Sequence, residues 1–134
     1  MRGTIAPAYV PIARSRSQRF DGKVLDAVED LEAHSGRDLA DLEFAVVDVP
    51  PVGAGENEAE FGPDMLADGG VPLSRILPST GTGTDTTPPR IVLYRRPLEA
   101  RAETDEDLDE VILEVVAEQV AAVLGIDRED LDQS

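Results

Sequence analysis

Apolar side chains recur at helical spacing between residues 17 and 35. Ser15 and Gln18 have the spacing of a capping box, in which both side chains satisfy free backbone groups at a helix start. Gly36 follows the stretch, and glycine commonly ends helices. The pattern therefore predicts a helix over 17–35, with a buried side formed by Phe20, Val24, Ala27, Val28 and Leu31.

Three short segments have the composition of β-strands. Residues 42–49 are rich in β-branched side chains and end at two prolines. Residues 73–77 form a short extended segment after Pro72. Residues 90–95 place four apolar side chains between two arginines, and Pro97 ends the run. The third segment is the strongest strand signal in the chain.

A second long helix is predicted after residue 104. Thr104 can cap it with its hydroxyl, and three acidic residues follow in the first turn, where the helix dipole favours them. Gly125 ends the pattern. The expected apolar face consists of Leu108, Ile112, Val115, Ala122 and Val123, flanked by Val111 and Val116.

The order of these elements favours one α+β domain. Two helices would cover one face of a small sheet, and a chain of 134 residues fits a single core. Residues 1–14 contain Pro7 and Pro11 and are expected to form an extended arm or a short edge strand. The domain is therefore predicted over 15–134.

Two stretches are expected to be mobile loops. Residues 51–70 are rich in glycine, alanine and acidic side chains, and residues 78–89 read PSTGTGTDTTPP. Neither stretch offers the apolar area that would offset the entropy of ordering it. The Gly-Thr repeat lacks the lysine of a phosphate-binding loop, so we do not assign it that role.

The formal charge is −16, and it is unevenly distributed. Residues 1–23 carry five basic side chains and one acidic side chain, whereas the rest of the chain is strongly acidic. The basic segment is expected to offset the acidic body of its own or a neighbouring chain. We do not expect nucleic acid as a partner, because aromatic side chains do not alternate with the basic ones and the acidic body would repel phosphates.

Composition excludes several classes of site. The chain has no cysteine and one histidine, so it has no disulfide, no thiolate zinc site and no site that needs two imidazoles from one chain. His34 is expected in the last turn of the first helix, where an imidazolium suits the helix dipole. No apolar run reaches the length of about 18 residues that a membrane span needs. We expect a cytoplasmic protein.

Gln119 lies at the centre of the predicted apolar face of the last helix, with Glu118 at its edge. A buried amide without a partner costs about 1–3 kcal/mol, so Gln119 needs a hydrogen bond. The simplest interpretation is a hydrogen bond from helix to sheet, or a helix end that is partly open to water. The alternative is a cleft beside this face.

Several segments together resemble a known family. They are Arg2-Gly3, the helix start Ser-Arg-Ser-Gln-Arg-Phe at 15–20, the strand at 42–49 with its prolines, the strand at 90–95 with Pro97, and Leu-Gly-Ile-Asp at 124–127. The chain is similar to the minimal zincin-like metallopeptidases of bacteria, especially their actinobacterial branch. The resemblance implies a minimal zincin-like α+β fold, with a small mixed sheet of about three to four strands and two main helices packed on it.

In that family the last helix carries His-Glu-x-x-His, in which two histidines hold Zn²⁺ and the glutamate acts on the metal-bound water. Alignment on Gly125 places this motif on residues 118–122. Glu118 and Ala122 then stand at the histidine positions and Gln119 at the glutamate position. The resemblance therefore implies the fold but not the activity, because Gln119 cannot accept a proton at neutral pH and Ala122 cannot bind a metal.

The leading hypothesis is a non-catalytic zincin-like domain that acts through contacts with another protein or with itself. One alternative is a metal-dependent peptidase with an unusual site, for which Glu118 and Asp127 are the candidate oxygen ligands. A second alternative is a nucleic-acid accessory protein that uses the basic arm. We expect no cofactor and no catalytic residue, so Glu118, Gln119, Ala122 and Asp127 are vestigial positions.

Overall fold

The computed structural model describes residues 16–51 and 65–132, so the predicted arm at 1–14 lies outside the described residues. The described elements are α1 (Arg16–Ser35), β1 (Glu43–Val47), β2 (Met65–Asp68), β3 (Val71–Leu77), the 3-10 turn η2 (Gly83–Asp85), β4 (Arg90–Tyr94), α2 (Arg95–Glu99), α3 (Asp105–Leu124) and α4 (Arg128–Asp132). The division into an arm and one domain remains a prediction.

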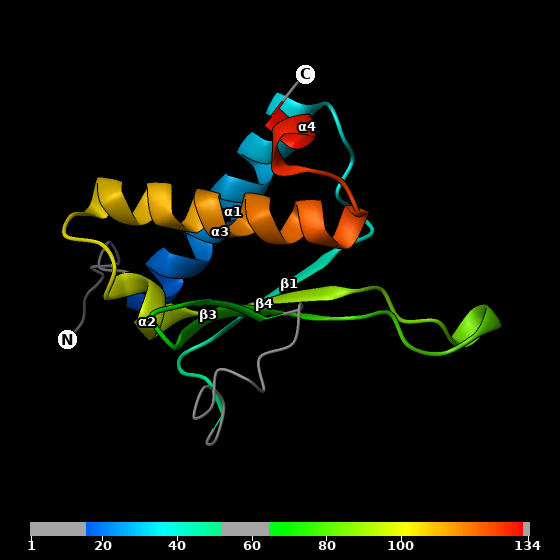
Figure 1. The fold of residues 1–134 in the computed structure, drawn as a ribbon, viewed down its shortest axis with the longest axis horizontal. Coiled ribbons are helices and arrows are strands. Elements are labelled where there is room, and N and C mark those ends of the chain that lie inside the picture. Colours follow the sequence, from blue (N-terminus) through cyan, green and yellow to red (C-terminus); the bar gives the residue numbers. More distant parts are fainter. Residues whose placement is uncertain (1–15, 52–64, 133–134) are drawn as a thin grey trace, which may run out of the picture.

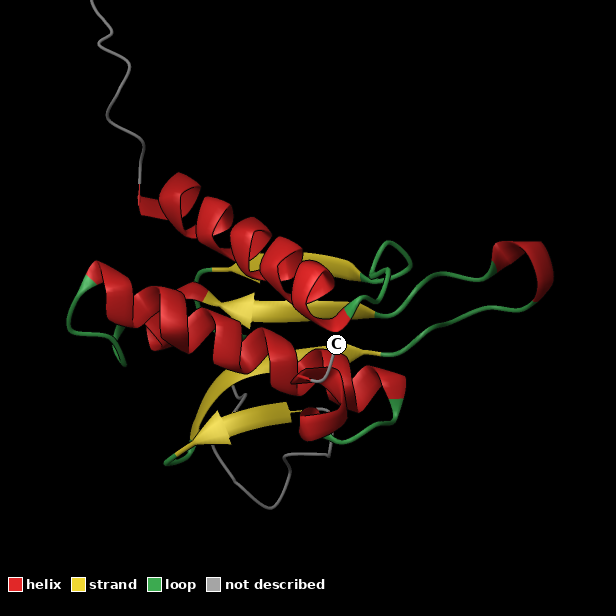
Figure 2. Cartoon of the chain, turned by 90° about the horizontal axis from the view of Figure 1, so that it is seen from above, coloured by secondary structure: helices red, strands yellow, loops and turns green. Residues whose placement is uncertain are grey.

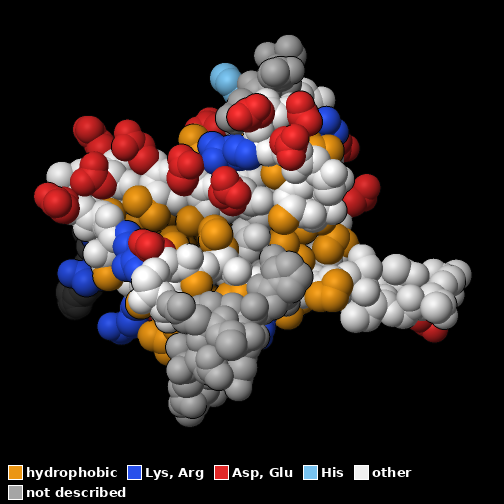
Figure 3. Space-filling model, viewed as in Figure 1, with side chains coloured by type: hydrophobic (Ala, Val, Ile, Leu, Met, Phe, Trp, Pro, Cys, Tyr) orange, Lys and Arg blue, Asp and Glu red, His pale blue; other side chains and the backbone are white. Residues whose placement is uncertain are grey.

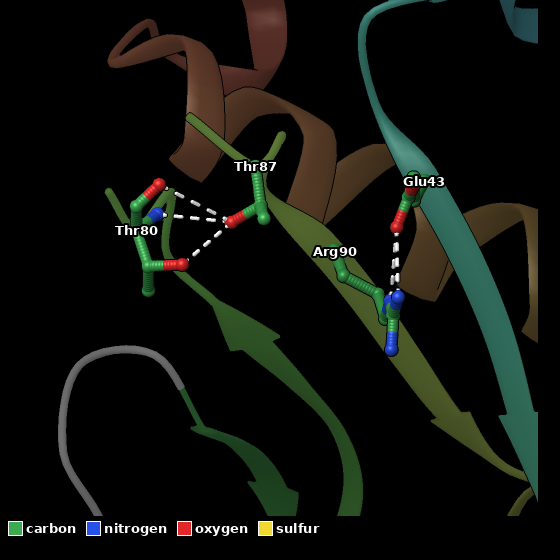
Figure 4. A network of polar contacts seen from close by, with 4 residues as sticks. All are labelled: Glu43, Thr80, Thr87 and Arg90. Atoms are coloured by element: carbon green, nitrogen blue, oxygen red, sulfur yellow. Dashed lines mark hydrogen bonds and ion pairs between the residues drawn. The ribbon is translucent and has the colours of Figure 1, made fainter. Parts of the chain in front are cut away.

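The strands form one mixed sheet in the order β1-β4-β3-β2. β1 pairs with β4 in parallel, whereas β4, β3 and β2 pair in antiparallel fashion. Both Nε and Nη2 of Arg90 on β4 donate to Oε1 of Glu43 on β1, at 3.1 and 2.9 Å (Figure 4). The expected small mixed sheet is confirmed.

α1 and α3 cover the same face of this sheet (Figures 1 and 2). The core lies between the two layers, where Phe20 and Leu31 of α1 and Ile112 and Val116 of α3 are buried together with Ile91 and Leu93 of β4. The prediction of two main helices on one face of a small sheet is therefore confirmed. α1 begins one residue before the predicted start and ends at the predicted end.

α3 has the predicted ends, and Leu108, Ile112, Val115 and Val116 of the predicted face are buried, but the buried side differs at the C-terminal end. The hydroxyl of Thr104 accepts the amide N–H of Asp107 at 3.0 Å, and Gly125 ends the helix with a φ of 70°. Ala122 is exposed and Val123 is half-buried, whereas Val120 and Ala121 are buried. The predicted face was wrong at this end because α3 packs against α1, α4 and β3, so its buried surface is wider than one stripe.

The predicted loop at 51–70 contains a strand, which corrects that prediction at β2. Gly69 and Gly70 have φ of 58° and 80°, and this left-handed turn folds β2 back onto β3. Two glycines form such a hairpin turn without steric strain, and this two-residue turn was the missed signal. Residues 52–64 of the predicted loop lie outside the described residues.

Residues 78–89 form a structured hairpin rather than an irregular linker. The N–H of Thr87 donates to the carbonyl of Thr80 at 2.8 Å, and the two hydroxyl oxygens lie 2.6 Å apart (Figure 4). The hairpin, here called the threonine arm, projects from the end of β3 and β4 beyond the rest of the molecule (Figures 1 and 3). The expected loop at 78–89 therefore contains a β-bridge and a 3-10 turn that were not predicted, and its mobility stays a prediction.

Two short helices were not predicted. α2 begins directly after β4, and its Pro97 lies in the first turn, where a missing N–H costs no helical hydrogen bond. α4 follows α3 and buries Leu131 completely. Among residues 16–51 and 65–132, no helix is both long and apolar enough to cross a membrane.

Candidate functional site

The four vestigial positions lie at the C-terminal end of α3 and in the turn that follows it. Gln119 is buried, with 4% of its surface exposed. Glu118 and Ala122 are exposed, and Asp127 is exposed between α3 and α4. The four residues therefore lie in one region, but only the side chain of Gln119 is buried in the core.

Gln119 forms a hydrogen bond from α3 to the sheet. Its Nε2 donates to Oγ of Ser74 on β3 at 2.7 Å, and Ser74 is fully buried. This bond confirms the simplest interpretation of a glutamine in an apolar helix face. A polar residue within the apolar segment 73–77 was the available signal for Ser74, which the sequence analysis did not single out.

Glu118 takes part in an ion-pair cluster between α3 and α4. Nη1 of Arg128 lies 3.6 Å from Oε1 of Glu118 and 3.1 Å from Oε1 of Glu114. The Glu118 side chain is half exposed, so water screens the pair and its contribution to stability is small. The cluster shows that the carboxylate of Glu118 already faces a cation.

The donor atoms at these positions do not fit a zinc site. Ala122 has no donor atom, and Nε2 of Gln119 is used by Ser74. Glu118 offers a carboxylate that an arginine already faces. Throughout the described part of the chain, no three or more His, Cys, Asp and Glu side chains are grouped so that they could hold a metal ion. Residues 118–122 therefore do not supply the ligand set of the family motif.

The region also lacks an accessible nucleophile beside a base. Ser74 is the hydroxyl next to Gln119, but its side chain is sealed in the core and accepts the amide of that glutamine. His34 is exposed near the end of α1, as predicted, and borders a cavity whose lining includes Leu113 and Arg128 but not Gln119. Ser74 and His34 therefore do not form the exposed nucleophile–base pair that a serine hydrolase needs.

Hydrophobic side chains gather on the surface between α3 and the sheet (Figure 3). Acidic side chains lie along α3 on the same face of the molecule. Partly buried apolar residues that pack against the core come from both sides, including Leu66 and Ile76 of the sheet and Val111 of α3. Apolar side chains of α3 and of the sheet therefore meet at this surface.

A buried arginine, Arg95, which was not singled out from the sequence, holds the C-terminal end of β1 against α2. Nε of Arg95 donates to Oδ1 of Asp48 at 2.9 Å, and its Nη1 donates to Oε1 of Glu99 at 3.1 Å. The hydrogen bond from Arg95 holds the pKa of the Asp48 carboxyl below its ordinary value, and it raises the pKa of Arg95. The cluster ties the end of β1 to α2 and has a structural role.

Lys23 links the two long helices. Its Nζ lies 2.7 Å from Oδ1 of Asp109 and 3.4 Å from Oδ2 of Asp105. The hydrogen bond to Asp109, followed by the charges of the two carboxylates, raises the pKa of Lys23 against the opposing effect of burial. Lys23 therefore holds the first turns of α3 against α1.

Comparison with known proteins agrees with the fold and with the resemblance. No curated protein matches the chain. The family model of the zincin-like metallopeptidases matches residues 39–134, which include the whole sheet and α3. This match covers more than half of the sequence, and the chain therefore belongs to the zincin-like metallopeptidase family.

Proposed function

We propose that this protein is a non-catalytic zincin-like domain that acts through protein contacts. The observation that carries the proposal is the state of Gln119, a neutral amide bound to Ser74 in the core. It stands where the family motif has a glutamate that takes a proton from metal-bound water. An amide has no such capacity at neutral pH.

The donor set at residues 118–122 supports the same conclusion. A catalytic zinc needs three protein ligands and one open position. Position 122 is an alanine, and the carboxylate at position 118 is engaged by Arg128. Because the residues present do not fit the metal, we derive no catalytic step through zinc. The proposal includes a cytoplasmic location.

Exposed apolar side chains support a role in protein contacts. Leu25 on α1 is 64% exposed, and Val49, just beyond β1, is 50% exposed. Single exposed apolar residues are ordinary, but Leu25 adjoins a groove of about 260 Å³ that Phe44 and Val46 of β1 also line. β1 is an edge strand of the sheet in the described part of the chain.

A peptidase assay tests the proposal. The purified protein is incubated with casein, an unfolded protein substrate, in the presence and absence of added zinc. We expect no cleavage above that of the buffer. Cleavage that requires zinc, stops with a chelator and is lost in Glu118→Ala would overturn the proposal in favour of a peptidase with an unusual site.

The variant Glu129→Ala is the matched control for this assay. Glu129 is an exposed acidic residue on the neighbouring helix α4. Its removal changes the net charge by the same amount as Glu118→Ala. A contaminating peptidase would be unaffected by either substitution, so only loss of activity in Glu118→Ala alone assigns cleavage to this chain.

A further inference from the structure

A groove runs between the two long helices. One cavity of about 250 Å³ and another of about 500 Å³ are lined by residues of α1, α3 and α4, and none of their lining residues comes from the sheet. The two cavities share Asp30 of α1 and Leu113 of α3. They therefore join into one continuous groove, here called the interhelical groove, between helices that lie next to each other in Figure 2.

The floor of the interhelical groove is apolar. Ala27, Leu31 and Ala117 are buried, and Leu113 is partly buried. Alanine at two of these four positions adds little volume above the floor, so the groove stays open. Apolar side chains of a partner could therefore enter it between the helices.

The walls of the interhelical groove are acidic. α1 contributes Asp26 and Asp30, and α3 contributes Asp109 and Glu110. The lysine and the arginine in the lining are already paired: Lys23 with Asp105 and Asp109, and Arg128 with Glu114 and Glu118. A net negative potential is therefore left along the groove, and it attracts positive charge.

We propose that the interhelical groove is a docking site for an amphipathic helix of a partner protein, with apolar residues on one face and basic residues beside them. Helix-in-groove recognition uses such apolar anchors spaced three and four residues apart. The site rests on the proposed role in protein contacts and assigns a surface and a partner class to it. The long helices α1 and α3 of a second copy of this chain are disfavoured as occupants, because both are acidic and would face these acidic walls.

The proposal is tested with a model peptide. The probe is a fluorescent helical peptide of about 18 residues, long enough to follow most of α3, with leucine on one face and lysine elsewhere. A second peptide carries glutamate in place of lysine. Fluorescence polarisation with the full chain should show saturable binding of the lysine peptide at one site and no binding of the glutamate peptide.

Two variants with the same change in net charge locate the binding site. Asp30→Lys with Glu110→Lys reverses charge on both walls of the groove and should weaken binding by at least about tenfold. Glu29→Lys with Glu129→Lys reverses two exposed charges that do not line the groove, and should weaken binding by less than about twofold. Circular dichroism checks that both variants are folded.

A third variant tests the apolar floor, because Leu113→Ala removes a partly buried side chain without changing any charge. It should weaken binding of the lysine peptide severalfold. Equal weakening by the two charge variants, or equal binding of the two peptides, would overturn the groove as a site. Either result leaves the proposed non-catalytic function intact, whereas zinc-dependent cleavage of casein would overturn that function and leave the groove untouched.

Discussion

Gln119 is the residue on which the proposed loss of catalytic activity depends most. Its side chain is buried, and it joins α3 to β3 through Ser74. A glutamate at this position would have to be buried beside the same hydroxyl, with the cost of removing a charge from water. The glutamine therefore suits a structural role as the helix-to-sheet donor to Ser74.

A double-mutant cycle measures this bond. Gln119→Leu leaves the Ser74 hydroxyl buried without its donor and should lower the free energy of unfolding by about 1–3 kcal/mol. Ser74→Ala should be destabilising for the same reason. Urea unfolding of both single variants and of the double variant gives the coupling. The double variant should lose less stability than the sum of the two, and strict additivity would show that the bond contributes nothing.

The ion pair between Arg95 and Asp48 makes the stability of the fold depend on pH. The pKa of Asp48 is lowered in the folded protein by the hydrogen bond from Arg95, so the folded state binds this proton more weakly than the unfolded state. The stability from this pair is complete above the ordinary aspartate value of about 3.9 and is lost as the pH falls through the lowered pKa. Asp48→Asn should destabilise the protein at neutral pH.

Thermal unfolding between neutral pH and about pH 2 checks this expectation. The wild type should melt at a higher temperature than Asp48→Asn at neutral pH, and this difference should shrink below about pH 4. Asp21→Asn, which replaces an exposed aspartate of α1, is the control and should show no such trend. A difference in melting temperature between wild type and Asp48→Asn that is constant across this range would contradict the assigned pair.

At the scale of elements, the segments with a periodic apolar pattern could be predicted from the sequence. The short elements, whose positions depend on turns and on neighbouring elements, could not. The helical spacing of Phe20, Val24, Ala27 and Leu31 located α1, because its one-sided burial repeats over several turns. β2 and α4 are too short for such a pattern, and their positions depend on contacts with β3 and α3. Leu131 of α4 is buried only because α3 ends at Gly125 and the chain turns back.

The threonine arm shows the same limit. Its two sides are joined at Thr80 and Thr87 by hydrogen bonds, and residues 78–88 are all exposed. Neither hydrophobic spacing nor burial signals such a hairpin. Gly81 has a φ of 89°, and a Cβ at this position would lie 2.2 Å from the carbonyl oxygen of Asp85. The arm therefore depends on local turn geometry rather than on the core.

Gly81→Ala should disturb the arm without affecting the core. The melting temperature should change by less than about 2 °C, because no buried apolar contact is lost. In limited proteolysis of the wild type, cleavage within residues 78–89 should appear at an earlier time than cleavage within β4. In the variant, cleavage within residues 78–89 should be faster still. Gly36→Ala is the control, since it also replaces a glycine of positive φ but lies outside the arm. A large cooperative loss of stability in Gly81→Ala would show that the arm supports the core.

At the scale of the whole molecule, the chain belongs to the zincin-like metallopeptidase family, and we propose that it has different side chains at the family's catalytic positions. The sequence alone predicted the family and the small α+β fold, whereas the placement of the motif on residues 118–122, counted back from Gly125, stays a prediction. The partner of Gln119 and the interhelical groove could not be predicted in the same way. Both depend on which residues of distant segments come together in the fold. Ser74 of β3 meets Gln119 of α3, and Asp30 of α1 lines the same cavity as Leu113 of α3.

The most direct test of the central claim is the zinc content of the purified protein, measured by elemental analysis. The wild type is compared with a variant in which the two histidines of the family motif are introduced. Glu118→His with Ala122→His places two imidazoles one helical turn apart, about 5–6 Å between their Cβ atoms, which is close enough to share one Zn²⁺. Glu106→His with Glu110→His, an exposed pair with the same spacing on α3, is the control for weak binding by any histidine pair.

We predict less than about 0.1 equivalent of zinc in the wild type, since the described residues 16–51 and 65–132 hold no group of three or more side chains that could bind the metal. We predict more zinc in the 118/122 variant than in the control pair, with a higher melting temperature when zinc is added. Near-stoichiometric zinc in the wild type, lost on Glu118→Ala or Asp127→Asn, would contradict the claim that this zincin-like chain has given up its metal site.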